Sequence, residues 1–394
     1  MRGFDIRGGG PVALTATLAL MALLLGACGN APSAARSSVS RVAVGLDDCG
    51  HGWTDPRPGR QVFELHNSTV GGAEVYLESP SDGAVYLDVE SMGPNSTRRA
   101  SVTLGNGTYR FVCLPADHDP IEAAKVTITG GGKVAGLTPG IRPVTQNDLI
   151  PALKTYQGWI AGRLPVLLKQ VEQLQTDVAA GDLRTARQSW LTAHMTYETL
   201  GAAYDAFGDY DAAINGNPSP GSSALDDAHL EGFHRIEAML WHGRTAAEIG
   251  PHVARLVHAV SSLRTAFAQD RINPVDIGLR AHEILENALQ FELTGRTDAG
   301  SHTNLATIDA NLTGTREALA PIKGILSSRY PDLDRTEQAI TDAQHVVGSY
   351  RHNGHWTSLT SLSRSQREQL NARIDATLEL LAPVAAITDP RKAA

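Results

Sequence analysis

The pattern of hydrophobic and polar positions divides the chain into two parts, and the first part alternates in short segments. Gln61-Val-Phe-Glu-Leu and Ala84-Val-Tyr-Leu-Asp-Val are two such segments within residues 41–130. Turn signals such as Ser81-Asp-Gly and Gly105-Asn-Gly separate the segments at a spacing of about ten residues. This pattern is typical of a small sandwich or barrel, so residues 41–130 are predicted to form an all-β domain.

The second part of the chain has helical periodicity. Glycine and proline are frequent over residues 131–145, which predicts a linker. Beyond it, apolar residues recur three and four positions apart, and Ser363-Arg-Ser-Gln366 has the spacing of a helix capping box. Residues 146–394 are therefore predicted to form an all-α domain, with helices over 148–179, 182–207, 226–241, 246–268, 274–293, 301–330, 333–350 and 363–381.

The first residues read as an export signal. Two arginines precede an apolar run that ends in Leu25-Gly-Ala-Cys28, which is a lipobox. The run is short for a membrane span and has the charged-then-apolar order of a signal peptide. We predict a lipoprotein signal peptide over residues 1–27, lipidation of Cys28, a tether over 28–40, and a lipid-anchored position on the extracytoplasmic face of the cell membrane. An ordinary signal peptide with an incidental Cys28 is the alternative.

Cysteine usage and charge narrow the picture further. Once Cys28 carries lipid, Cys49 and Cys113 remain, and outside the cytoplasm such a pair predicts one disulfide. A formal net charge of −8 and the absence of a basic cluster argue against nucleic acid as a partner. The 42% of apolar residues is enough to build ordinary cores for two or three domains.

Candidate metal ligands appear on the predicted helix 182–207. Trp190, His194, Tyr197 and Glu198 share one face at helical spacing. The face is partly aromatic, which predicts that it is buried, and a buried carboxylate needs a partner or a metal ion. The alternative is that His194 and Glu198 lie at the edge of the apolar stripe.

A second predicted helix carries His234 and Glu237 in a His-x-x-Glu arrangement, one turn apart. This spacing allows an imidazole and a carboxylate to converge on one ion, as paired ligands do in helix-bundle carboxylate sites. A solvated pair is the simpler interpretation of so short a motif. The apolar Leu230 and Trp241 on the same face favour burial and therefore the metal site.

A third predicted helix places His282 and Glu286 four residues apart. The segment is similar to a His-Glu-x-x-His zinc motif whose second histidine is replaced, which disfavours a thermolysin-like protease. Ser301-His302-Thr303 follows. It supplies either another imidazole or, more simply, a helix N-cap at Ser301.

Taken in order, these motifs resemble a known family. Tyr197-Glu198, Gly232-Phe-His-Arg-Ile-Glu237, Glu286, Ser301-His-Thr303 and Tyr350-Arg351 are similar to the imelysin-like domain of EfeO-type iron uptake lipoproteins, over residues 145–388. The resemblance implies an all-α imelysin-like helical bundle behind an all-β cupredoxin-like sandwich. It also implies a metal centre that uses Glu198, His234 and Glu237, with Glu286 as a fourth candidate.

A cupredoxin-like domain raises the question of copper. His118 follows Cys113 as in cupredoxins, but type-1 copper needs two histidines and a cysteine, usually with a methionine. No histidine stands near Glu74 and no methionine follows His118 within residues 41–130, so copper is not expected in the N-terminal domain. Glu74, Asp117, His118 and Asp119 form either a weak cation site or a solvated loop.

The resemblance implies that the chain captures iron, as Fe²⁺ or Fe³⁺, and delivers it to an EfeU-like permease, with an EfeB-like haem peroxidase alongside. By ligand type alone the site also suits manganese or zinc, and Zn²⁺ is expected to bind in vitro. An imelysin-type metallopeptidase, with Glu283 as its base, is the alternative. It is disfavoured because ligands are found without a separate base or oxyanion arrangement. A purely structural surface lipoprotein is the third hypothesis.

Overall fold

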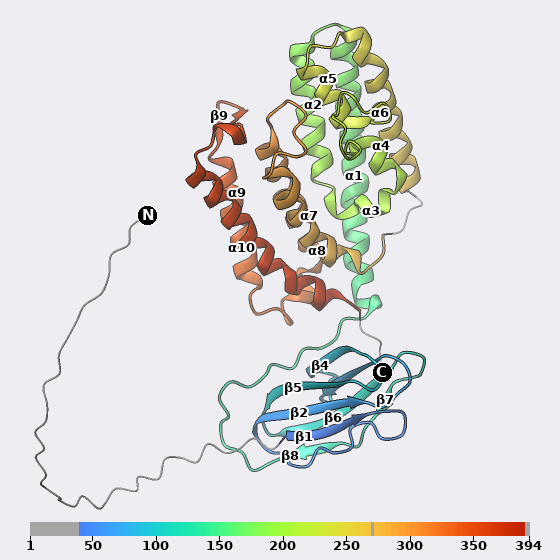
Figure 1. Ribbon diagram of the computed structural model, residues 1–394, viewed down its shortest axis with the longest axis vertical. Coiled ribbons are helices and arrows are strands. Elements are labelled where there is room, and N and C mark those ends of the chain that lie inside the picture. Colours follow the sequence, from blue (N-terminus) through green and yellow to red (C-terminus); the bar gives the residue numbers. More distant parts are fainter. Residues whose placement is uncertain (1–38, 269–271, 391–394) are drawn as a thin grey trace, which may run out of the picture.

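The computed structural model describes residues 39–268 and 272–390. The predicted signal peptide, Cys28 and most of the predicted tether lie outside the described residues. The last two tether positions belong to the first strand, which begins at Val39. A β-rich region is followed by a helical domain, as predicted (Figure 1).

The β-rich region consists of two sheets. One has the strand order β1-β2-β5, and the other is a five-stranded sheet of β4-β3-β6-β7 in which β8 also pairs with β6. β1 runs parallel to β2, and the other pairs are antiparallel. The strands are β1 Val39–Val44, β2 Gly59–Asn67, β3 Ala73–Glu78, β4 Val85–Met92, β5 Thr97–Leu104, β6 Gly107–Pro115, β7 Ile121–Glu122 and β8 Val126–Ile128.

The inward residues of both sheets share one core. Phe63, Phe111 and Trp53 pack edge to face, with ring centroids 5.2 to 5.6 Å apart. Cys49 and Cys113 are joined by a disulfide bond at the side of this core. The sulfur of Cys113 is therefore not a free thiolate for copper. Two sheets around one core agree with the predicted sandwich, and the cupredoxin-like label stays a prediction.

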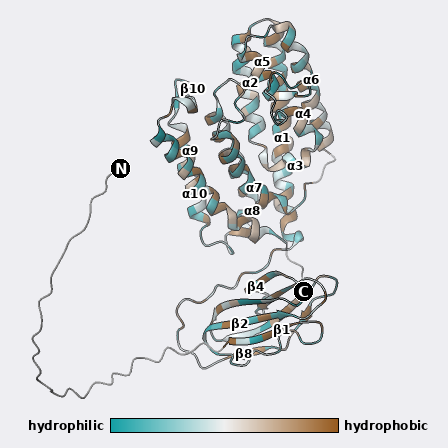
Figure 2. Cartoon of the chain, viewed as in Figure 1, coloured by the Kyte–Doolittle hydropathy of each residue, from teal (hydrophilic) through white to brown (hydrophobic). Residues whose placement is uncertain are grey.

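The helical domain has a single continuous core, to which each long helix contributes an apolar face; Figure 2 shows apolar and polar residues on every one of them. No helix among the described residues is long and apolar enough to cross a membrane. The elements are α1 Gln146–Ala179, α2 Leu183–Glu198, η1 Gly201–Ala203, α3 Tyr204–Phe207, α4 Asp209–Asn215, α5 Gly232–Trp241, α6 Ala246–Phe267, α7 Asp276–Asn287, the π-helical turn η2 Ala288–Glu292, α8 Asn304–Leu326, α9 Leu333–Gly348, the hairpin β9 Arg351–His352 and β10 His355–Trp356, η3 Leu359–Ser361, and α10 Arg364–Thr388.

The helix predicted over 182–207 is divided in the structure. α2 ends at Glu198, and η1 and α3 turn back over its last residues. The hydroxyl of Tyr204 donates to the backbone carbonyl of Tyr197 at 3.1 Å, which ties the start of α3 to the last turn of α2. Close packing adds to this contact, since a Cβ on Gly201 would lie 2.8 Å from Ile284.

The start of α1 allows a test of the fold at the junction with the linker. Thr145 caps this helix in a capping box with Asp148. We expect Thr145→Ala to lower the free energy of unfolding by about 1 kcal/mol, because it leaves a backbone N–H at the helix start without its acceptor. Urea denaturation followed by far-ultraviolet circular dichroism measures the loss. Thr155→Ala, on the exposed side of the same helix, is the control, with an expected change of about 0.5 kcal/mol or less; an equal loss in both variants contradicts the prediction.

Candidate metal centre

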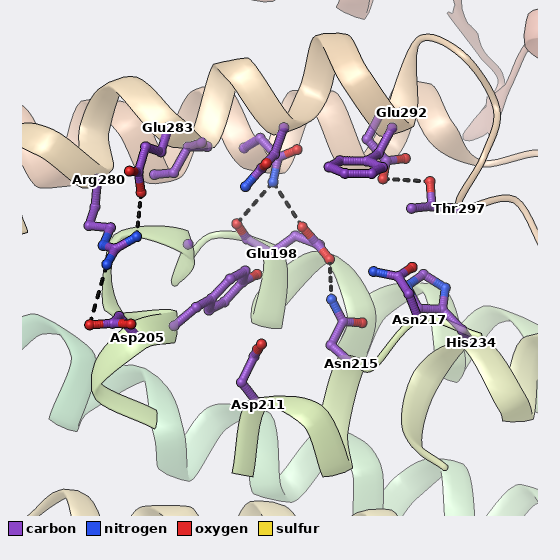
Figure 3. A pocket seen from close by; sticks show the side chains of 16 residues that line it. Glu198, Asp205, Asp211, Asn215, Asn217, His234, Arg280, Glu283, Glu292 and Thr297 are labelled. Atoms are coloured by element: carbon purple, nitrogen blue, oxygen red, sulfur yellow. Dashed lines mark hydrogen bonds and ion pairs between the residues drawn. The ribbon is translucent and has the colours of Figure 1, made fainter. Parts of the chain in front are cut away.

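Buried ionisable side chains gather where α2, α5, η2 and α8 meet. Glu198, His234, Glu237 and Glu292 are each less than 9% exposed. They come from α2, α5 and η2, and part of the group lines the cavity in Figure 3. Burying several carboxylates together is unfavourable unless hydrogen bonds or a cation compensate their charge, so the partners of each carboxylate matter.

Glu198, the last residue of α2, accepts from two amides. The Nδ2 atoms of Asn215 and Asn311 each lie 2.8 Å from its carboxylate oxygens, and Nε2 of His194 lies 3.1 Å from Oε1. Burial alone would raise the pKa of Glu198, but His194 and the two amides lower it below the ordinary value. Glu198 is therefore a buried, ionised carboxylate in the folded chain.

His234 and Glu237 share the inner face of α5. The helix begins at Gly232, whose φ is +81°, and a Cβ there would lie 2.2 Å from the carbonyl oxygen of Ile214. Only glycine fits this start without strain. Nδ1 of His234 lies 3.6 Å from Oε2 of Glu237. The predicted His-x-x-Glu pair is thus fully buried, and it is not a solvated pair.

Backbone groups fix the other oxygen of Glu237. Its Oε1 accepts from the N–H of Ala299 at 3.1 Å and from the N–H of Ser301 at 2.9 Å. The loop between η2 and α8 therefore holds the carboxylate by one oxygen, while the second oxygen faces His234. Burial alone would lower the pKa of His234, but Glu237, Glu292 and Glu198 together raise it above the ordinary value.

Glu292 is a site residue that the sequence analysis missed. Its carboxylate accepts from Oγ1 of Thr297 at 2.6 Å and from Nδ2 of Asn304 at 3.0 Å. Burial and the nearby charge of Glu198 raise its pKa above the ordinary value. Glu292 lies at the end of the π-helical turn η2, a feature that is frequent at functional sites.

Glu286, the fourth predicted ligand, is not brought to this group. It does not line the cavities around His234, and its carboxylate accepts from Nε2 of Gln290 at 3.1 Å. The prediction assumed a regular helix through residue 293. Glu286 lies on regular α7 before η2, and α7 borders the cavity with Glu283, Ile284 and Asn287 instead. The extra residue in the turn of η2 changes the phase only after α7, where Glu292 reaches the cavity.

His194 adds a second imidazole. It stacks on Trp190 with ring centroids 4.8 Å apart, and its ring centroid is 5.6 Å from that of His234. Nδ1 of His194 and Nδ1 of His234 are buried without a hydrogen-bond partner among the described residues, while Nε2 of His194 faces Glu198. Buried imidazole nitrogens without partners are unfavourable in a metal-free site and are suited to ligating an ion.

Two cavities meet at His234 and Glu292. A small one of about 10 Å³, which also touches His194 and Glu237, has the size of one water molecule or ion. The larger, of about 220 Å³, is lined by Glu198 and Asn215 as well (Figure 3). Glu198 and Glu237 thus border different cavities, with His234 and Glu292 between them.

The outer part of the larger cavity is lined by ion-paired side chains. Arg280 of α7 forms ion pairs with Glu283 and with Asp205 of α3 (Figure 3). Glu283, the residue considered as a hydrolytic base, is therefore engaged by a guanidinium group. Its ion pair with Arg280 would have to break before this carboxylate could accept a proton from a water molecule.

The acidic residues predicted near the end of the sandwich do not come together. Glu74 lies with Asp88 and Glu90, and their ligand atoms are within 4.8 Å of one another. Asp117 and His118 line a different hollow, and Asp119 is exposed and not part of it. The structure does not bring Glu74, Asp117, His118 and Asp119 into one site, because the carboxylate of Glu74 gathers with those of Asp88 and Glu90 of β4. The alternative, a solvated loop, agrees with the exposed positions of Asp117, His118 and Asp119.

Comparison with known proteins gives consistent matches. The family model described as Imelysin matches residues 152–384. The chain is similar to the iron uptake system component EfeO of Yersinia pestis, with 23% identity over 367 residues that cover 92% of this chain and 95% of that protein. It is also similar to EfeO of Escherichia coli strain K12, with 20% identity over 298 residues, or 74% and 76% of the two chains.

Proposed function

The chain belongs to the imelysin family, whose model matches more than half of its length, and from this premise we propose that it binds iron as a component of an iron uptake system. One observation carries the proposal. The buried imidazole of His234, with an unpartnered nitrogen, stands among three buried carboxylates at the junction of two cavities. Such a group is unfavourable by itself and is compensated by a cation.

The ligand types support iron. Carboxylate oxygens and imidazole nitrogens suit Fe(II), Fe(III), Mn(II) and Zn(II), and the names of the relatives favour iron among these. We propose that the ion lies among Glu198, His234, Glu237 and Glu292. His194 stands next to this group with Nδ1 unpartnered and Nε2 beside Glu198, and it completes the set of donors.

Binding is favoured over peptide hydrolysis. The alternative function, an imelysin-type metallopeptidase, needs a free base beside the metal. Glu283 is paired with Arg280, and both Glu198 and Glu292 already accept hydrogen bonds from amides or hydroxyls. The iron-loaded chain is accordingly expected to leave casein intact; cleavage that Glu283→Gln abolishes would favour the peptidase.

The location and the partners are proposed from the sequence and from the family resemblance. The lipobox at Cys28 supports a lipoprotein anchored on the extracytoplasmic face of the cell membrane. A component of an uptake system hands its ion to other components. We propose an EfeU-like permease as the acceptor of the iron and an EfeB-like haem peroxidase as a second partner.

Anaerobic titration with Fe(II) tests the proposed function. We expect the two-domain chain that begins at residue 29 to bind one tight equivalent of iron, measured by competition with a chromophoric chelator. Glu286→Gln should bind iron equally well, because Glu286 lies away from the cavities. An absence of stoichiometric binding would leave the structural lipoprotein as the better hypothesis, and weaker binding by Glu286→Gln would contradict the site.

A further inference from the structure

A second hollow reaches the metal centre from another side. It has a volume of about 460 Å³ and is lined by His234, His242 and His302, and by the loop from Gly295 to Gly300. The proposed iron site uses only His234 of these histidines. His242 and His302 lie at exposed positions, and the proposed function gives neither of them a role.

The side chain of His302 is oriented by a carboxylate. Its Nδ1 lies 2.6 Å from Oδ2 of Asp298, while Oδ1 of Asp298 accepts from the backbone N–H groups of Gly300 and His302. The φ of His302 is +59°, a left-handed conformation that is strained for histidine. The loop thus holds this imidazole in one orientation at the expense of backbone strain. Capping of α8 does not explain the histidine, because the N-cap of that helix is Thr303.

His242 is also oriented by a hydrogen bond at its Nδ1. It follows the end of α5, and its Nδ1 lies 2.8 Å from the backbone carbonyl oxygen of Ala238. The loop packs against it, because a Cβ on Gly300 would lie 3.0 Å from Cε1 of His242. His242 and the loop that carries His302 are therefore direct neighbours on the same hollow.

Both contacts fix the tautomer of the ring. A carbonyl oxygen and an ionised carboxylate only accept hydrogen bonds, so Nδ1 donates in both histidines and the lone pair of each neutral ring is left on Nε2. Metal-binding histidines have this arrangement, with one ring N–H donated to a carboxylate or a backbone carbonyl and the other nitrogen free to ligate. The two histidines of the hollow are prepared as ligands in the absence of an ion.

We propose that His242 and His302 form a second, outer metal site, which binds a borderline divalent transition metal ion such as Zn²⁺, Co²⁺ or Fe²⁺. Imidazole nitrogen is the ligand that these ions prefer, and water completes the coordination. With two protein ligands at exposed positions, the outer site should bind its ion more weakly than the buried centre does and exchange it faster. Because His234 borders this hollow and the inner cavities, an ion at the outer site is adjacent to a ligand of the inner one.

Zinc titration in a background without the inner site tests this proposal. In a His234→Ala, Glu237→Gln chain, in which glutamine keeps an oxygen for the N–H groups of Ala299 and Ser301, we expect one weak Zn²⁺ equivalent by isothermal titration calorimetry. Adding His242→Gln and His302→Asn should remove it, and His302→Asn alone should weaken it at least tenfold. Asparagine tolerates a positive φ, so this variant keeps the loop conformation. His66→Gln, at an exposed histidine of β2 whose Nδ1 is also engaged, is the matched control and should bind normally.

Chemical modification gives an independent measurement. We expect Zn²⁺ to protect His242 and His302, but not His66, from diethylpyrocarbonate in the same background, as mapped by mass spectrometry. Any of three results would overturn the outer site. They are a Zn²⁺ equivalent that is still bound after His242→Gln and His302→Asn, no weak Zn²⁺ equivalent at all, or equal reactivity of His242 and His302 towards diethylpyrocarbonate with and without zinc. Since His234 and Glu237 of the inner site are replaced in this chain, failure here is distinct from failure of the iron-binding function, which the wild-type titration tests.

Discussion

His234→Ala is expected to bind Fe(II) about 100-fold more weakly than the wild-type chain, which corresponds to about 2.8 kcal/mol of binding free energy. The reason is its position, because His234 borders both inner cavities and lies among all three buried carboxylates. Without the imidazole, an ion in either cavity loses a nitrogen ligand. Competition with a chromophoric chelator under anaerobic conditions gives the two dissociation constants.

Glu237, the carboxylate beside His234, allows a second substitution whose expected loss of Fe(II) affinity is smaller. Glu237→Gln keeps an oxygen that can accept from Ala299 and Ser301, so the loop should stay in place while the negative charge beside His234 is lost. We expect a loss of affinity of about tenfold to 100-fold. Affinity equal to the wild type in both His234→Ala and Glu237→Gln would refute the site, whatever the total iron content of the protein.

Much of the fold is predictable because the two periodicities of the sequence are clear. Alternation over β1 and helical spacing over α1 and α6 come from one face of each element being buried, and burial of one face is a local property of the pattern. The pairing of parallel strands β1 and β2 is not predictable in this way. It depends on contacts between separate segments and leaves no mark in either one alone.

The candidate site is predictable only where its residues share a regular helix. His234 and Glu237 lie one turn apart on α5, so their spacing alone places them together. Asn215 and Asn311, which fix Glu198, come from α4 and α8, and only the tertiary fold brings their amides to one carboxylate. The resemblance to a family identified Glu198, but it contained no information on these partners.

Glu292 shows why regular spacing fails at a functional site. The predicted helix over 274–293 assumed 3.6 residues per turn throughout. The π-helical turn η2 holds an extra residue, and its residues and those after it therefore point elsewhere than the pattern indicates. Glu286 lies before this turn, on α7, and its side of α7 does not border the cavity.

Glu292→Gln is expected to change iron affinity and metal-free stability in opposite directions. The ionised carboxylate is unfavourable in the metal-free fold, because burial and the charge of Glu198 raise its pKa. Glutamine keeps an oxygen for Thr297 and removes the charge, so the free energy of unfolding without metal should rise by roughly 1 kcal/mol. Affinity for Fe(II) should fall at least tenfold, since the ion loses an anionic ligand, which is about 1.4 kcal/mol.

The pH dependence separates this explanation from a change in packing. A carboxyl group with a raised pKa in the folded state makes the fold less stable above that pKa, and this destabilisation is lost as the pH falls towards the ordinary value of 4.5. Urea denaturation of the metal-free chains should therefore show Glu292→Gln more stable than wild type at neutral pH, with a gap that closes on acidification. Glu286→Gln, on the same segment but away from the cavities, should show neither effect. A difference in unfolding free energy that is the same at all pH values would mean that charge is not the cause. A metal-free Glu292→Gln chain that is less stable than wild type at neutral pH would mean that the buried carboxylate stabilises the fold and is not kept for binding a cation.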